Sequence, residues 1–187
     1  WRSFVYPEKA VEISFHEFPR NSFVPEKTIV ARLEGCEAAP HDFGVTPKYY
    51  AMAVNNLTID PLPYIAGLKG AGECLVSQPD LPLKFYIIPR DGSSSPTVIE
   101  GPSKAFEIHT PFAHDGVPID DSFAVPSSEA NDEFMTLYSA GWDDFKEGTF
   151  LGEWGASQEW NFLIASSLTP DFNNIDSTVL WRYVVNI

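Results

Sequence analysis

The sequence predicts an all-β fold. Apolar residues fall in short runs rich in β-branched and aromatic side chains, and clusters of Pro, Gly, Asn and Asp separate these runs. No helical periodicity continues for more than about two turns. With 187 residues, 44% of them apolar, the chain can bury a hydrophobic core. We therefore expect one all-β domain over residues 1–187.

Eight segments have the composition of strands. In chain order they are Val11–Phe15, Thr28–Leu33, Tyr49–Leu57, Leu83–Pro89, Thr97–Glu100, Phe106–His109, Phe134–Ser139 and Thr178–Ile187. Turn-forming residues bound them: Pro19–Asn21 follows the first strand, Asp60–Pro63 the third, Arg90–Pro96 the fourth, and Gly116–Pro118 the sixth, while Thr169–Asp171 precedes the last. The last segment alternates apolar and polar residues up to the final residue, and the chain begins without Met, so we expect an internal part of a longer protein.

Residues 61–82 are apolar and rich in Gly and Pro, without strand periodicity. Such a segment can pack on its own sheet as a loop, or it can touch a lipid surface. We keep both interpretations, and with the second a peripheral membrane contact.

Net charge excludes one class of partner. The chain carries a formal charge of −14, which repels nucleic-acid phosphates. It contains no apolar run of membrane-spanning length, no phosphate-binding glycine loop and no Ser nucleophile motif. Two cysteines are too few for a disulfide framework, so we expect a reducing compartment, either cytoplasm or plastid.

Two of the four histidines lie where strands begin or end. His41 follows Pro40 and precedes an aromatic strand, and His109 ends the strand that starts at Phe106. Imidazole is the commonest protein metal ligand. Ligands 68 positions apart meet only if distant strands reach a common axis, as in a β-propeller. Taken alone, each residue can equally be a hydrogen-bonded structural histidine, and the strands suit a sandwich or jelly roll equally well.

Four segments, in one order, resemble signatures of the carotenoid cleavage oxygenases. They are His41–Tyr50, Phe85–Arg90, Phe106–Gly116 and Leu180–Asn186. This family also includes lignostilbene dioxygenases and the retinoid isomerase of the retinal pigment epithelium. The resemblance implies part of a seven-bladed β-propeller that holds Fe(II) on four histidines. His41 resembles the second ligand and His109 the third, and the other two are expected outside this chain.

The resemblance also implies a reaction. Fe(II) and O2 would cleave a conjugated C=C bond of a carotenoid or apocarotenoid into two carbonyl products, with stilbene cleavage as an alternative. An apolar polyene needs an apolar, aromatic-lined tunnel. Candidate lining residues are Phe43, Phe106, Phe112 and Trp142.

One stretch departs from the family pattern. After the third histidine the family has Asn-Ala-x-Glu, whereas this chain has Phe112-Ala113-His114-Asp115. Local hydrogen bonding is therefore expected to differ. Among the rival interpretations are a metal-free acidic propeller or sandwich that binds another protein, and a catalytically incomplete fragment. The sequence does not predict an oligomeric state.

Overall fold

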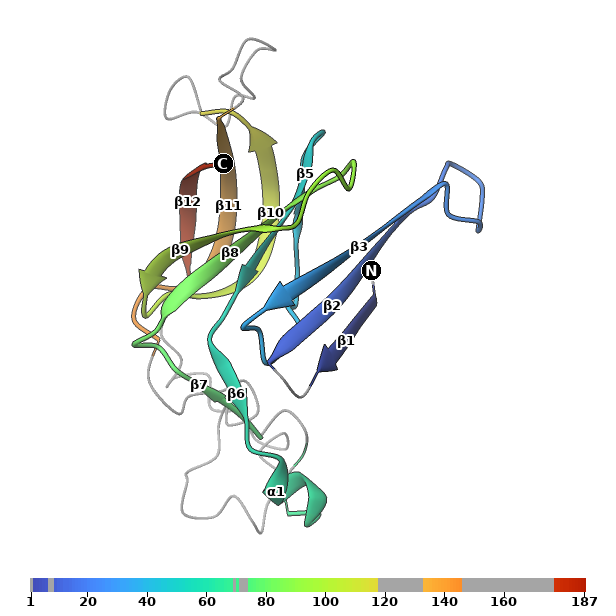
Figure 1. The fold of residues 1–187 in the computed structure, drawn as a ribbon. Coiled ribbons are helices and arrows are strands. Elements are labelled where there is room, and N and C mark those ends of the chain that lie inside the picture. Colours follow the sequence, from blue (N-terminus) through green and yellow to red (C-terminus); the bar gives the residue numbers. More distant parts are fainter. Residues whose placement is uncertain (1, 7–8, 69, 71–73, 118–132, 146–176) are drawn as a thin grey trace.

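The fold is an antiparallel β-structure of three larger sheets and one small one (Figure 1). The computed structural model describes residues 2–6, 9–68, 70, 74–117, 133–145 and 177–187. The first sheet contains β1 (Arg2–Tyr6), β2 (Ala10–Glu17) and β3 (Lys27–Glu34). The second contains β4 (Gly44–Val45), β5 (Tyr49–Val54), β8 (Pro82–Pro89) and β9 (Thr97–Ser103). The third contains β10 (Phe106–Asp115), β11 (Phe134–Trp142) and β12 (Val179–Asn186).

A small hairpin extends the second sheet at one end of the molecule. β6 (Leu57–Ile59) pairs with β7 (Leu75–Ser77), and α1 (Pro61–Ile65) lies beyond them at the bottom of Figure 1. Helix α1 begins at Pro61 because the Asp60 side chain accepts a hydrogen bond from the Leu62 amide, 3.3 Å away. No helix in the described part of the chain is long and apolar enough to cross a membrane.

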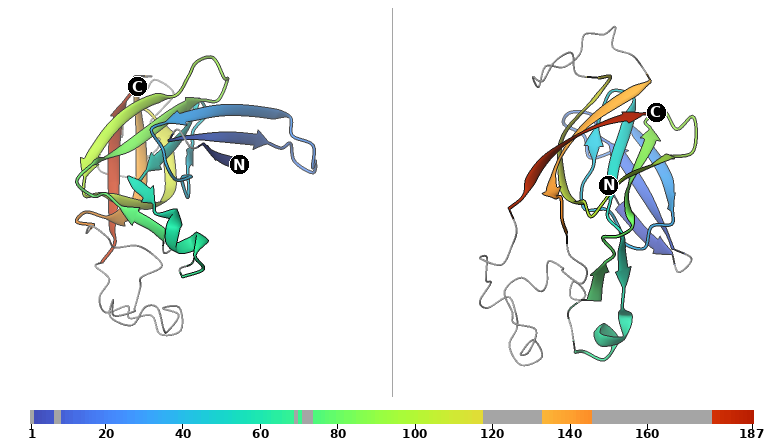
Figure 2. Two further views of the ribbon diagram at one scale, coloured as in Figure 1. Left: turned by 60° about the horizontal axis from the view of Figure 1, so that its bottom comes forward. Right: turned by 90° about the vertical axis from the view of Figure 1, so that its left-hand side faces the viewer.

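The middle sheet is buried on both faces. Alternate β5 residues point to opposite sides: Tyr50 and Met52 pack against the first sheet, and Ala51 packs against the third. β8 does the same, with Tyr86 on one face and Phe85 on the other. Burial on both faces explains why the sequence of β8 is apolar without alternation. Figure 2 shows the three sheets successively side by side, as neighbouring blades.

The strands of the first and third sheets follow one another in the sequence, and in the second sheet β6, α1 and β7 are inserted between the paired strands β5 and β8. This antiparallel meander is typical of a propeller blade. The all-β prediction and the partial β-propeller are confirmed. Two segments differ in extent. The strand predicted to end at His109 continues to Asp115, and the region after Leu57 contains β6, α1 and β7 where a loop was expected. A two-residue strand such as β4 is too short to leave a periodic pattern in the sequence.

Candidate metal centre and pocket

His41 and His109 lie side by side. Their ring centres are 5.2 Å apart, and the ring planes make an angle of 62°. His41 stands three residues before β4 and His109 lies on β10. β4 and β10 are edge strands of neighbouring sheets and contact each other. Both histidines are exposed, the His109 side chain by 60%.

Two irregularities in the β10–β11 ladder turn His109 outward. The register shifts between Glu107 and His109 and again between His109 and Phe112. Such bulges re-aim side chains and are common beside functional sites. Gly141, opposite Glu107, allows the strands to approach, since a Cβ there would lie 1.9 Å from the Phe106 carbonyl oxygen.

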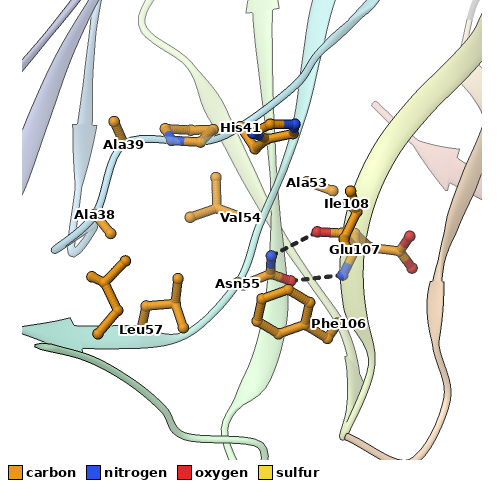
Figure 3. A pocket seen from close by; sticks show the side chains of 12 residues that line it. Ala38, Ala39, His41, Ala53, Val54, Asn55, Leu57, Phe106, Glu107 and Ile108 are labelled. Carbon is orange, nitrogen blue, oxygen red and sulfur yellow. Dashed lines mark hydrogen bonds between the residues drawn. The ribbon is translucent and has the colours of Figure 1, made fainter. Parts of the chain in front are cut away.

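Side chains bind the backbone on either side of His109. The Asn55 amide donates to the Glu107 carbonyl oxygen at 2.7 Å, and its oxygen accepts from the Glu107 amide at 2.8 Å (Figure 3). Asp42 Oδ2 accepts from the Thr110 amide at 2.9 Å and lies 3.5 Å from His109 Nδ1. The Ser139 hydroxyl donates to the His109 carbonyl oxygen at 3.0 Å.

The Glu107 carboxyl group lies on the other side of β10 from Asn55 (Figure 3). The Tyr183 hydroxyl donates a hydrogen bond to its Oε1. Burial raises the pKa of Glu107, and hydrogen bonds from Ser139 and Tyr183 oppose this rise. Burial also raises the pKa of Tyr183, and the Glu107 carboxylate adds to it.

An apolar pocket of about 320 Å³ adjoins His41 (Figure 3). This is the lower end of the range for small-molecule sites. Its walls come from the loop before β4, the end of β5, β6, β7 and the start of β10; the lining residues are Ala38, Ala39, Pro40, His41, Ala53, Val54, Asn55, Leu57, Leu75, Phe106, Glu107 and Ile108. Among these residues, Asn55 uses its side-chain amide in two hydrogen bonds to the Glu107 backbone.

The four proposed tunnel residues lie in different places. Phe106 lines the pocket. Trp142 lies behind it, with ring centres 6.1 Å apart. Phe43 packs on Phe15 in the core between the first two sheets, with ring centres 5.3 Å apart. Phe112 lies further along β10, its ring 5.9 Å from that of Tyr138.

The separation of the His41 and His109 rings is compatible with two ligands of one metal ion. Imidazoles that share an ion through bonds of about 2.0–2.1 Å place their ring centres about 4.5–5.5 Å apart when the bonds are roughly perpendicular or tetrahedral. The observed 5.2 Å lies within this range. Within the described ranges, no group of three or more His, Cys, Asp or Glu side chains could hold a metal ion. His114 is buried, and its ring lies against Phe112 and Tyr138 and not against His41 or His109.

Comparison with known proteins identifies the class. Residues 4–187 match the model of the family described as RPE65, retinal pigment epithelial membrane protein. The apocarotenoid-15,15'-oxygenase of Synechocystis sp. is 33% identical over 124 residues, which are 66% of this chain and 24% of that protein. This chain therefore spans about a quarter of the length of that relative.

Solved structures agree with the fold. A mutant of the Synechocystis apocarotenoid oxygenase superposes with a TM-score of 0.71 at 22% identity, over 98% of this chain and 32% of that one. The cobalt-substituted enzyme gives a TM-score of 0.69 at 22% identity, over 97% and 31%. The chain belongs to the carotenoid cleavage oxygenase family, as its motifs indicated.

Proposed function

We propose that the complete protein is an Fe(II)-dependent dioxygenase that cleaves a conjugated C=C bond of a carotenoid or apocarotenoid. The alkene and O2 give two carbonyl products, one oxygen atom in each, so no other reductant is needed. The observation that carries the proposal is the convergence of His41 and His109 at 5.2 Å beside an apolar pocket, in a chain of this family.

In this proposal, residues of this chain would bind the iron and the polyene and would orient them for the reaction. His41 and His109 would hold the iron through neutral imidazole nitrogens, together with ligands from other parts of the complete protein. Bound Fe(II) would supply the activation of O2. The apolar walls, among them Leu57, Leu75 and Phe106, would hold the polyene and keep water from the reacting bond. Asp42 lies near His109 Nδ1, where a carboxylate favours binding through the other ring nitrogen.

The test uses the complete protein, purified without oxygen and loaded with Fe(II). We expect about one iron per chain, and loss of iron and of aldehyde formation in His41→Ala and His109→Ala. His16→Ala is the matched control, because His16 lies on the β2–β3 hairpin and bonds the Thr28 hydroxyl at 3.0 Å. Wild-type protein without stoichiometric iron would favour the metal-free binding module.

The products of the reaction show which class of substrate the complete protein cleaves. Incubation with β-carotene, an apocarotenal and a stilbene, followed by identification of the aldehydes, distinguishes carotenoid, apocarotenoid and stilbene cleavage. We expect cleavage of a polyene because the Synechocystis relative is an apocarotenoid-15,15'-oxygenase.

A peripheral membrane contact forms the second part of the proposal. Leu62 and Ile65 on α1 and Leu68 after it are 72%, 76% and 73% exposed. Helix α1 lies at one end of the molecule (Figure 1). Phosphatidylcholine vesicles should retain the complete protein in a flotation assay. Leu62→Glu with Ile65→Glu should release it, while Val30→Glu, at a β3 position that is 58% exposed, should not. Equal retention of all three proteins would contradict the contact.

A further inference from the structure

Four backbone polar groups around His109 are held by side chains. They are the amide and carbonyl of Glu107, the carbonyl of His109 and the amide of Thr110. A bulge removes such groups from the ladder, and each must find another partner or lose a hydrogen bond. The irregular part of β10 is therefore held in place by specific side chains as well as by its neighbouring strand.

Two of these side chains come from the segment that carries His41. Asp42 follows His41 directly, and Asn55 comes directly after β5, the strand paired with β4. Their attachment points bracket His109, because Glu107 lies two residues before it and Thr110 one residue after. The two contacts join the second sheet to the third on both sides of the histidine.

Asn55 forms a pair of hydrogen bonds with the Glu107 backbone that few other side chains could form. Its amide presents a donor and an acceptor in one plane, as a neighbouring strand's backbone would. Because β10 is an edge strand of its sheet, Asn55 thereby takes the place of a neighbouring strand beside Glu107. A carboxylate of the same size can accept from the Glu107 amide but cannot donate to the Glu107 carbonyl.

We propose that Asn55 and Asp42 are positioning residues that set the distance between His41 and His109. The consequence for metal binding rests on the proposed function, whereas the consequence for ring position does not. Without Asn55, the Glu107 end of the bulge loses both of its hydrogen bonds to the second sheet, and of the two side-chain links beside His109 only that of Asp42 remains.

The experiment compares Asn55→Leu with Asn56→Leu in the complete protein. Asn56 is a matched control, because its side-chain amide also bonds a backbone carbonyl, but that of Pro82 on β8 in place of one on β10. Crystal structures without metal give the ring separation, and titration with Co(II), followed by its visible absorption, gives metal affinity. Asn55→Asp keeps the side chain's size and acceptor, and remains informative if Asn55→Leu fails to fold.

In Asn55→Leu the separation should move from 5.2 Å by about 1 Å or more. Its Co(II) affinity should fall about 10- to 100-fold with an altered absorption band, as for other residues that orient metal ligands. Asn55→Asp should fall between it and wild type, and Asn56→Leu should match wild type in both measurements. Unchanged separation and affinity in both Asn55 variants would overturn the inference. Wild-type protein that binds no Co(II) would contradict the proposed function, while the ring separation would still decide the role of Asn55.

Discussion

Arg90, directly after β8, binds both carboxylate oxygens of Glu17, the last residue of β2. Nε donates to Oε1 at 2.9 Å, and Nη2 lies 2.8 Å from Oε2. The Tyr50 hydroxyl donates to the same Oε1. Arg90 Nη1 also donates to the Thr46 carbonyl oxygen at 2.7 Å. This cluster joins the first sheet to the β4–β5 turn.

The first prediction concerns pH. Hydrogen bonds from Arg90 and then Tyr50 lower the pKa of Glu17 from 4.5 to about 2. Since the folded-state pKa lies below the unfolded value, the stabilisation is present above pH 4.5 and is lost as the pH falls toward 2. Glu17→Gln should lower the free energy of unfolding at pH 7 by about 1–2 kcal/mol, after allowance for solvent screening.

Urea titrations of wild type and variant at several pH values between 7 and 2 check this. The difference in unfolding free energy between them should stay constant down to about pH 4.5 and shrink between pH 4.5 and 2. Glu34→Gln is the control, since Glu34 forms an exposed ion pair with Arg32. A difference that does not vary with pH would show that the Glu17 pair contributes no stability through ionisation.

The second prediction concerns the contact between β4 and β10. A Cβ on Gly44 would lie 2.8 Å from Ala113 Cβ and 3.0 Å from Thr110 Cγ2. Gly44→Ala should therefore destabilise the protein by about 1–3 kcal/mol, the usual cost of overpacking. Thermal or urea unfolding of wild type and variant measures this loss of stability.

Ala113→Gly supplies the control for that change. In the double variant the two methyl groups no longer collide, so its loss should be smaller than the sum of the single losses. Additive losses would place the strain elsewhere.

The third prediction concerns the pocket. Ala39 is exposed on the pocket wall, so Ala39→Phe can fill the space without disturbing the core. In the complete protein, kcat/KM for an apocarotenal should fall about tenfold or more, which is about 1.4 kcal/mol of transition-state binding. The melting temperature should stay unchanged.

Val98→Phe is the comparison, because Val98 is 48% exposed on β9, away from the pocket. Its kcat/KM should equal that of wild type. Equal activity of Ala39→Phe would show that the polyene binds elsewhere.

The fourth prediction concerns the 187-residue chain expressed by itself. It would contribute only two imidazoles, His41 and His109, to the proposed metal site, so iron binding should be weak and cleavage undetectable. β12 is an edge of its sheet within the described structure, and Leu180 on it is 59% exposed, so we also expect self-association. Size-exclusion chromatography with light scattering and metal analysis test both, and a monomer with tightly bound iron would contradict this.

Much of the fold follows from local sequence. The strands of all three sheets except β1 and β4 were evident from apolar runs and turn residues, because side chains on a pleated strand are buried in a regular order. His41 and His109 were identifiable as a pair by their motifs. The distance between the two rings was not predictable from the sequence, since it depends on contacts between sheets.

The residues that hold the pair were missed. Asn55 ends an apolar strand and Asp42 lies in a loop, and such polar residues usually face water. Gly141 inside a strand was the one local signal, because an isolated glycine there suggests a bulge or a close approach. The bulges themselves depend on how β10 meets two neighbours, which no single segment encodes.

The short hairpins within the sheets have a consequence for folding. The β2–β3, β4–β5 and β8–β9 pairs join strands with short connections, so the loops they close are short and can form early, whereas β5–β8 and β11–β12 close longer loops. The approach of His41 to His109 requires two finished sheets to dock. A newly made chain should therefore acquire its hydrogen-bonded strands before it can capture an ion, and early intermediates should be insensitive to metal.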